Sequence, residues 1–185
     1  MNAWEKPTSL VIGGVGFSIR TDFRAILDIL KYYNDPDYED DEKVLICLQI
    51  LYRDFDSIPP ERYEEALEKA VEFIDAGIED DGKSKPRLMD WEQDAALLLP
   101  PINKQLGYDC RDIENLHWWT FIGAYMEIGE SLFSEVLHIR SKKAKGKRLE
   151  KYEQEFYREN KHLIDIKTKL SEEEEAEKAR LNSLI

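Results

Sequence analysis

The chain has 185 residues, and its hydrophobic fraction of 42% suits a globular domain with a core and excludes wholesale disorder. Acidic residues outnumber basic ones by 39 to 26, for a formal net charge of −13. This charge opposes contact with nucleic acid or an anionic membrane, so we expect neither as a partner.

The residues also indicate where the protein works. Residues 1–7 lack a basic segment followed by an apolar one, and no apolar run is long enough to span a bilayer. Cys47 and Cys110 lie far apart and belong to no CxxC pair. We therefore expect two buried, unpaired thiols in a reducing compartment, and a cytoplasmic location.

The first predicted element is a β-hairpin. Residues 9–12 and 17–20 are short β-prone runs, and the glycines of residues 13–16 suit a turn between them. An isolated hairpin is marginal in water, so this one is expected to pack on the rest of the chain.

Three helices are predicted next. The first is capped by Thr21 or Asp22, the second covers residues 44–52, and the third opens with Pro60 in its first turn and ends near Gly77. The second is apolar nearly all round, which predicts the most buried helix. Apolar residues at helical spacing mark the first and third: Phe23, Ile26, Leu27 and Leu30, then Tyr63, Ala66, Leu67, Ala70, Phe73 and Ile74.

A polar stretch separates these helices from the next ones. Residues 79–87 read as a linker, after which Asp90 can cap a helix that begins at Trp91. Pro100 and Pro101 are expected to kink or break this helix, because proline lacks the backbone donor and clashes with the preceding turn. A turn is predicted at residues 107–109.

Residues 113–140 are predicted to form the longest helix, with a broad apolar face. Four aromatic residues lie close together in it: Trp118, Trp119, Phe121 and Tyr125. The two adjacent tryptophans point about 100° apart on a helix, so one is expected in the core and the other partly exposed or at an interface. Core packing is the first interpretation of this cluster, and all four are also candidate partner-binding residues.

The composition changes at Arg140. A basic stretch at residues 142–151 is followed by a charged helix and then by a short helix that begins at Ser171, with Glu174 at capping-box spacing. The basic stretch reads as a solvated hinge or a contact to acidic groups. We therefore predict a helical core domain with the hairpin at 1–140 and a charged helical extension at 141–185. The extension has a thin stripe of Leu149, Tyr152, Phe156, Leu163 and Ile166, of which Tyr152 and Phe156 are further partner-binding candidates.

Two Glu-x-x-His pairs, Glu114/His117 and Glu135/His138, have the spacing of di-iron bundles. Such a site needs the pairs on facing helices, whereas both fall on one predicted helix, about 30 Å apart. We therefore predict no metal site. His117 is interpreted as a hydrogen-bonding group at the helix start, and His138 as a cation in the last turn.

Other motifs of catalysis fail as well. The acidic loop at residues 35–41 lacks the glycine and the terminal glutamate of a calcium loop, and residues 13–16 are not followed by the Gly-Lys-Ser/Thr of a phosphate loop. No GxSxG is present. We predict a protein that is mainly α, is not an enzyme, takes no cofactor, and acts by binding another protein.

Several short motifs, taken in order, resemble one known family. They are Thr21-Asp22-Phe23-Arg24, Asp94-Ala95, Gly107-Tyr108-Asp109, Leu116-His117-Trp118-Trp119-Thr120-Phe121, Ile139-Arg140-Ser141 and Ser171-Glu172-Glu173-Glu174. Together they resemble the bacteriophage "gp fifteen" family of Gram-positive siphophages and prophages over nearly the whole chain. The His-Trp-Trp-x-Phe element is the most specific, and Pro100 and Pro101 depart from the expected continuous helix.

The resemblance implies a tail-assembly chaperone. Such a protein would bind the tape-measure protein and possibly the tail-tube protein in the host cytoplasm, promote tube assembly and be absent from the virion. A structural component of the tail, such as a tube or terminator protein, is the alternative, and a metal-dependent helical enzyme is a weaker one. A homo-oligomer is compatible with each of these.

Overall fold

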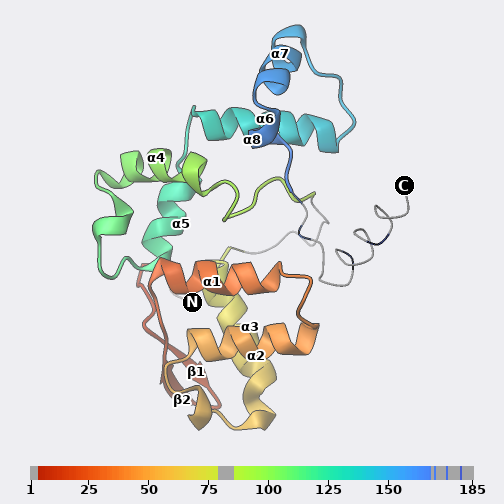
Figure 1. Cartoon of the computed structure of the whole chain (residues 1–185). Helices are drawn as coiled ribbons and strands as arrows, with labels where there is room; N and C mark the ends of the chain where they lie inside the picture. Colours follow the sequence, from red (N-terminus) through yellow and green to blue (C-terminus); the bar gives the residue numbers. More distant parts are fainter. Residues whose placement is uncertain (1–3, 79–85, 168, 170–173, 175–179, 181–185) are drawn as a thin grey trace. The chain divides into compact units, whose positions relative to one another are not determined.

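The computed structural model describes residues 4–78, 86–167, 169, 174 and 180, and it is mainly α with one small hairpin (Figure 1). The contacts divide the chain into two compact units. Unit 1 comprises Met1–Gly77 together with Thr168–Ile185, and unit 2 comprises Ile78–Lys167. The helices and the single small hairpin of the described residues confirm the predicted fold class, mainly α. The chain divides after Gly77, whereas the sequence analysis placed a boundary at residue 140.

Unit 1 begins with the predicted hairpin. Strand β1 (Ser9–Ile12) pairs antiparallel with β2 (Val15–Ser18), and Ile12 lies opposite Val15. The second strand thus starts two residues earlier than predicted. The reason is that Gly13 and Gly14 both adopt positive φ, at 57° and 83°, and so complete a two-residue turn by themselves.

The hairpin packs on the helices of unit 1. Leu10 and Ile12 are buried, and β1 contacts α3 (Tyr63–Ile74). At the turn, the Gly13 N–H donates to the Glu65 carboxylate of α3 at 2.9 Å. These contacts supply the support that an isolated hairpin lacks.

Helix α2 (Asp40–Leu51) packs against both α1 (Phe23–Tyr33) and α3. The Asp22 carboxylate caps α1 by accepting the Arg24 N–H at 3.0 Å, as predicted. A single 3-10 turn, η2 (Pro60–Arg62), holds the predicted proline, and α3 follows directly. A second 3-10 turn, η1 (Phe55–Ser57), precedes it.

Helix α2 is not the most buried helix, which corrects the sequence analysis. Cys47, Leu48 and Leu51 are its buried residues, while Leu45 is 40% exposed. The helix α5 of unit 2, although shorter, buries four residues. The apolar residues around α2 serve two surfaces, because one face packs in the core and another lines a groove, described below.

Unit 2 contains five α-helices among its described residues, and α4 runs unbroken through Pro100 and Pro101. The predicted break is therefore wrong. Leu98 and Ile102, on either side of the prolines, are buried, and α4 packs against α5, so tertiary packing offsets the lost backbone donors. The helices are α4 (Ala95–Leu106), α5 (Trp118–Met126), α6 (Leu132–Ala144), α7 (Lys151–Glu159) and α8 (Lys161–Ile164), with a 3-10 turn η3 (Cys110–Asp112).

The ends of α4 follow the sequence signals in part. The Asp90 carboxylate accepts the backbone N–H groups of Glu92 and Gln93, so it caps a turn at residues 91–94, and the α-helix itself begins at Ala95. At the other end Gly107 ends the helix with φ of 78°, as the predicted turn requires.

The predicted helix at residues 113–140 is two helices, α5 and α6, separated by residues 127–131. Ser131 caps α6 and forms a reciprocal pair with Ser134: each hydroxyl accepts the backbone N–H of the other residue. The prediction failed because the apolar pattern continues across this break, and it outweighed the Ser131 cap and Gly129.

Residues 141–167 fold back onto α6 and do not form a separate extension. Val136, Ile139 and Ile164 make a fully buried cluster, and the apolar residues packed on it are Leu97, Leu149, Phe156, Tyr157 and Leu163. Three residues of the stripe predicted for the charged segment, Leu149, Phe156 and Leu163, therefore pack within their own unit, whereas Tyr152 is exposed. The helix predicted from Ser171 lies outside the described residues, apart from Glu174 and Arg180, which are helical.

Candidate protein-binding surfaces

The aromatic cluster of α5 is mostly core. Trp118 and Phe121 are 2% and 3% exposed, and their rings stack with centroids 5.9 Å apart. Trp91 packs against both, and also against Tyr125 with centroids 5.1 Å apart. Edge and tilted ring contacts of this kind add to the stability gained by burying aromatic area. Trp118 and Phe121 are thus placed where no partner can reach them without unfolding.

The remaining partner-binding candidates are scattered. Trp119 is partly exposed, Tyr125 is half-buried with its hydroxyl 3.0 Å from the Met89 sulfur, and Phe156 packs on the cluster of α6 and α8. Tyr152 is 62% exposed. The structure thus brings Trp118, Phe121 and Tyr125 together through Trp91. Tyr152 is the exposed member of the set, and Trp119, Tyr125 and Phe156 are partly exposed.

His117 has the role predicted for it. Its ring Nδ1 accepts the Trp119 N–H at 3.0 Å, so the imidazole caps the N-terminus of α5. The first backbone N–H groups of a helix have no partner within the helix itself. The imidazole of His117 supplies a partner for one of them, that of Trp119.

A buried ion pair lies at the centre of unit 2. The guanidinium of Arg140 makes two hydrogen bonds to the Asp94 carboxylate, at 2.6 and 2.8 Å, and both side chains are at most 4% exposed. The remaining Arg140 donors reach the carbonyls of Leu88, Leu163 and Ile164 at 2.6–2.9 Å. All five N–H groups are therefore used, and one side chain joins α4, α6 and α8.

A second polar centre joins α6 and α7. The fully buried Glu153 carboxylate lies 2.6 Å from Lys142 Nζ and 2.9 Å from His138 Nε2. Hydrogen bonds from Lys142, from the Glu150 backbone N–H and from His138 together lower the pKa of Glu153 to about 2. His138 thus lies mid-helix and pairs with Glu153, which corrects the interpretation that placed it in a last turn. Lys142 thus pairs with Glu153 of α7, and Lys143 pairs with Asp165.

No metal centre was found in the described part of the chain, where no three His, Cys, Asp or Glu side chains form a suitable group. The two Glu-x-x-His pairs do not lie on one long helix as predicted, because α5 and α6 are separate. His117 and His138 instead make the contacts just described. The same part of the chain contains no helix that is both long and apolar enough to cross a membrane.

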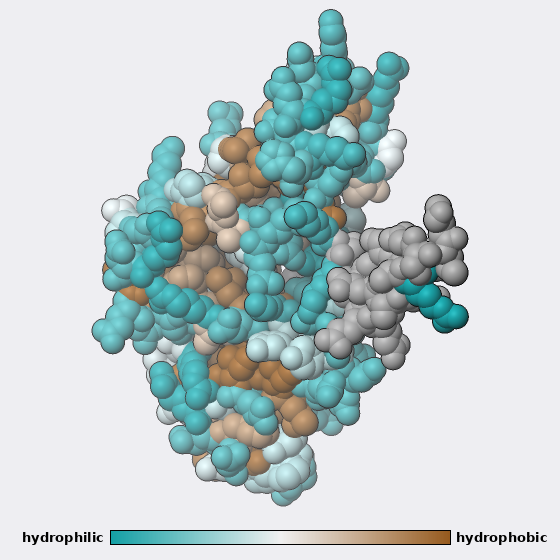
Figure 2. All heavy atoms as spheres, in the orientation of Figure 1, coloured by the Kyte–Doolittle hydropathy of each residue, from teal (hydrophilic) through white to brown (hydrophobic). Residues whose placement is uncertain are grey.

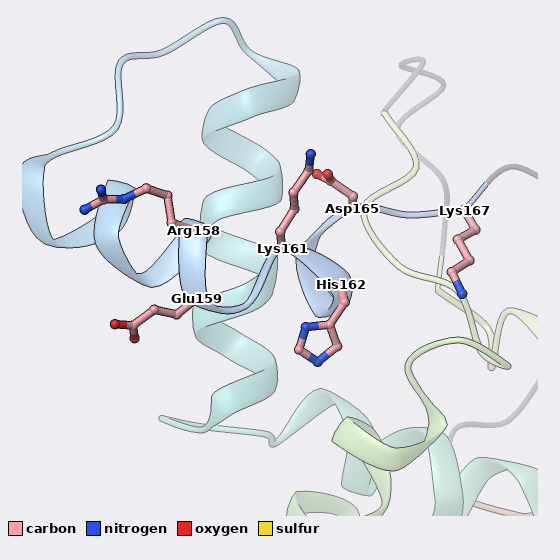
Figure 3. A pocket seen from close by; sticks show the side chains of 6 residues that line it. All are labelled: Arg158, Glu159, Lys161, His162, Asp165 and Lys167. Carbon is pink, nitrogen blue, oxygen red and sulfur yellow. The ribbon is translucent and has the colours of Figure 1, made fainter.

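A polar hollow of about 430 Å³ borders α7 and α8, and Figure 3 shows the side chains around it. Arg158 and Glu159 extend to one side, Lys161 lies beside Asp165, and His162 points away from both. These groups do not converge on one point, so the hollow has no arrangement that would hold a ligand.

Unit 1 has an apolar groove between α1, α2 and α3, with a volume of about 480 Å³. In Figure 2 brown, apolar surface is visible over the region of α1 and α2. The groove residues follow helical faces, and several of them are exposed, with Tyr33 at 69% and Val71 at 47%. The lining residues are Ile29, Leu30 and Tyr33 of α1, Asp40, Lys43, Val44 and Cys47 of α2, and Leu67, Val71, Ile74 and Asp75 at α3.

The sequence analysis missed this groove, although its pattern contained a signal. The α2 face at residues 40, 43, 44 and 47 has the spacing i, i+3, i+4, i+7 of one helical stripe. A helix that is apolar on all sides and also has such a stripe beside acidic residues can pack one face in the core and line a groove with another. Cys47 lies at the base, and burial raises the pKa of its thiol to about 11, so it acts as an apolar lining group.

The fold and groove define the class of this protein: a mainly helical chain of two compact units with an open apolar groove between three helices. A family model described as Bacteriophage Gp15 protein matches residues 5–166. The chain belongs to this bacteriophage family, as the sequence motifs indicated. No match was found among curated proteins or among solved structures.

Proposed function

We propose that this phage protein is a tail-assembly chaperone. It binds the tape-measure protein in the host cytoplasm, promotes assembly of the tail tube and is absent from the mature virion. It acts by binding, not by catalysis. The family membership gives the phage context, and the open groove of unit 1 is the observation that supports binding to another polypeptide.

The groove suits a client helix. An exposed apolar patch on a soluble protein is costly unless something covers it at work, and such patches mark interaction sites. A groove between helices receives an amphipathic helix through residues one turn apart on the client. Long helical clients with exposed apolar faces aggregate, and shielding those faces would keep them soluble until the tube forms.

The test is co-expression with the tape-measure protein of the same phage, followed by pull-down and size-exclusion chromatography. We expect the tape measure to become soluble and to elute with this chain. Val71→Glu places a charge on the apolar lining and should weaken the complex at least about tenfold. A tape measure that stays insoluble and unbound contradicts the proposal.

Leu45→Glu is the matched control. Leu45 is exposed to a similar degree as Val71, at 40% and 47%, and lies in the same unit, but it does not line the groove. Its replacement should leave the complex unchanged. Trp119→Ala and Tyr152→Ala test the accessible aromatic candidates of unit 2; if they abolish binding and Val71→Glu does not, the client surface is in unit 2.

A further inference from the structure

The negative charge of the protein is concentrated in the unit that carries the groove. Residues 4–78 contain 17 acidic and 8 basic side chains, whereas residues 86–167 contain 14 and 13. Unit 1 is therefore the acidic part of the described chain, and unit 2 is close to neutral. Whatever enters the groove approaches through a negative potential, which attracts cations and repels anions.

The groove has acidic residues at its rim. Asp40 and Asp75 line it, and the Asp40 side chain is fully exposed to solvent. The one basic lining residue, Lys43, lies 4.0 Å from Asp40 and offsets part of that charge. The connection from α1 to α2 adds Asp35, Asp37 and Glu39 just before α2, although none of these three lines the groove.

This acidic connection already binds a lysine. Nζ of Lys169 lies 2.6 Å from the Asp35 carboxylate and 3.1 Å from that of Asp37. The hydrogen bond from Lys169 lowers the pKa of Asp35. This contact shows how one ammonium group meets two carboxylates in the connection that precedes α2.

The lining also sets the length of an occupant. The α2 residues of the groove span Asp40 to Cys47, about two turns or 10 Å. On α3 the lining runs from Leu67 to Asp75 with the same repeat. A helix of two to three turns with one apolar stripe would place its side chains between these rows, as ridges do in the grooves of packed helices.

We infer that the groove binds a short amphipathic helix of another protein whose apolar stripe is bordered by lysine and arginine. The inference rests on the proposed function in that it names the kind of client segment recognised. The apolar stripe supplies burial in the groove, and the basic border matches the carboxylates of the rim. An acidic border would meet like charge and be rejected.

Two labelled synthetic helices test this directly. Both carry leucines at i, i+3, i+4 and i+7, and they differ only in a border of Lys and Arg or of Glu. Fluorescence anisotropy with the full chain should show the basic helix binding about tenfold more tightly at low salt, with the difference shrinking as salt rises. Equal binding of both helices, or binding of neither, overturns the inference.

Variants locate the contact. Val71→Glu should abolish binding of the basic helix, and Leu45→Glu should not. Asp40→Lys should weaken the basic helix several-fold and strengthen the acidic one. Asp41→Lys makes the same charge change one residue further along α2, outside the lining, and should have a smaller effect.

Other occupants give different results. If the basic helix binds only after the residues that follow Lys169 are removed, the chain's own C-terminal residues fill the groove and the inference fails. It fails equally if Val71→Glu turns a dimer into a monomer in light scattering, since a second copy is then the occupant. Co-purification of the tape measure in spite of either result would leave the proposed function standing and remove only this inference.

Discussion

Arg140 shows what a single side chain contributes to unit 2. It donates to the Asp94 carboxylate and to three backbone carbonyls, and it is almost fully buried. Buried charges of this kind are sensitive to the loss of one partner, because the other charge is left unpaired away from water.

We expect Arg140→Leu to destabilise the protein by about 3–5 kcal/mol, since it leaves the Asp94 carboxylate and three carbonyls without their donor. Arg148→Leu is the control, because Arg148 is exposed, and it should change stability by no more than about 0.5 kcal/mol. Urea denaturation followed by circular dichroism measures both. Equal midpoints for the two variants would refute the structural role of Arg140.

The sequence could show these two residues but not their pairing. Asp94 and Arg140 both belong to the motifs that carried the family resemblance, yet they are 46 residues apart. Arg140 stood at a change of composition and was interpreted as a boundary. No local pattern indicates that an arginine at such a position is buried, since burial depends on which distant carboxylate the fold brings to it.

At the scale of the element, the polar centre of Glu153, Lys142 and His138 joins α6 to α7, and its contribution to stability depends on pH. The pKa of Glu153 is lowered from 4.5 to about 2, chiefly by the hydrogen bond from Lys142 and also by those from the Glu150 backbone N–H and His138. A carboxyl whose pKa is lower in the folded state stabilises that state above its unfolded pKa, and the contribution is lost as the pH falls through the folded pKa.

We therefore expect Lys142→Met to lower the melting temperature at pH 7, and expect its difference from the wild type to shrink as the pH falls from about 4.5 towards 2. Lys145→Met, an exposed lysine just after α6, serves as the control and should follow the wild type throughout. Differential scanning calorimetry across this range decides the matter. A constant difference at all pH values would contradict the assignment.

Elements with local signals were predicted well. The hairpin, the Asp22 cap of α1 and the His117 cap of α5 all depend on residues within a few positions of one another. The break between α5 and α6 and the unbroken α4 were not predicted. The unbroken α4 depends on tertiary packing, which holds the helix through Pro100 and Pro101. The break before α6 had a local signal in the Ser131 cap, but the apolar pattern continues across it.

The groove was the part of the candidate site that sequence reasoning could not locate. Its lining comes from three helices, and each helix shows only an ordinary stripe of apolar residues. Conversely, the aromatic residues of α5 stood out in the sequence because of their density, and most of them form core. Residue type predicts burial better than it predicts which apolar surface stays open.

At the scale of the whole molecule, the question is whether the protein leaves the assembled tail. We expect mass spectrometry of purified virions to show no peptides of this chain, while the infected-cell lysate contains it in complex with the tape measure. The known tail-tube protein of the same phage is the internal positive control. Stoichiometric amounts in virions would favour the structural alternative over a chaperone.

The return of the chain to unit 1 has a consequence for synthesis. Lys169 binds Asp35 across a separation of 134 residues, so all of unit 2 is made between the two halves of this contact. The three helices that line the groove leave the ribosome long before Lys169 does. The groove can therefore form, and a client can meet it, while the rest of this chain is still being translated. The Lys169 contact forms later, because bringing together residues so far apart in the chain costs conformational entropy.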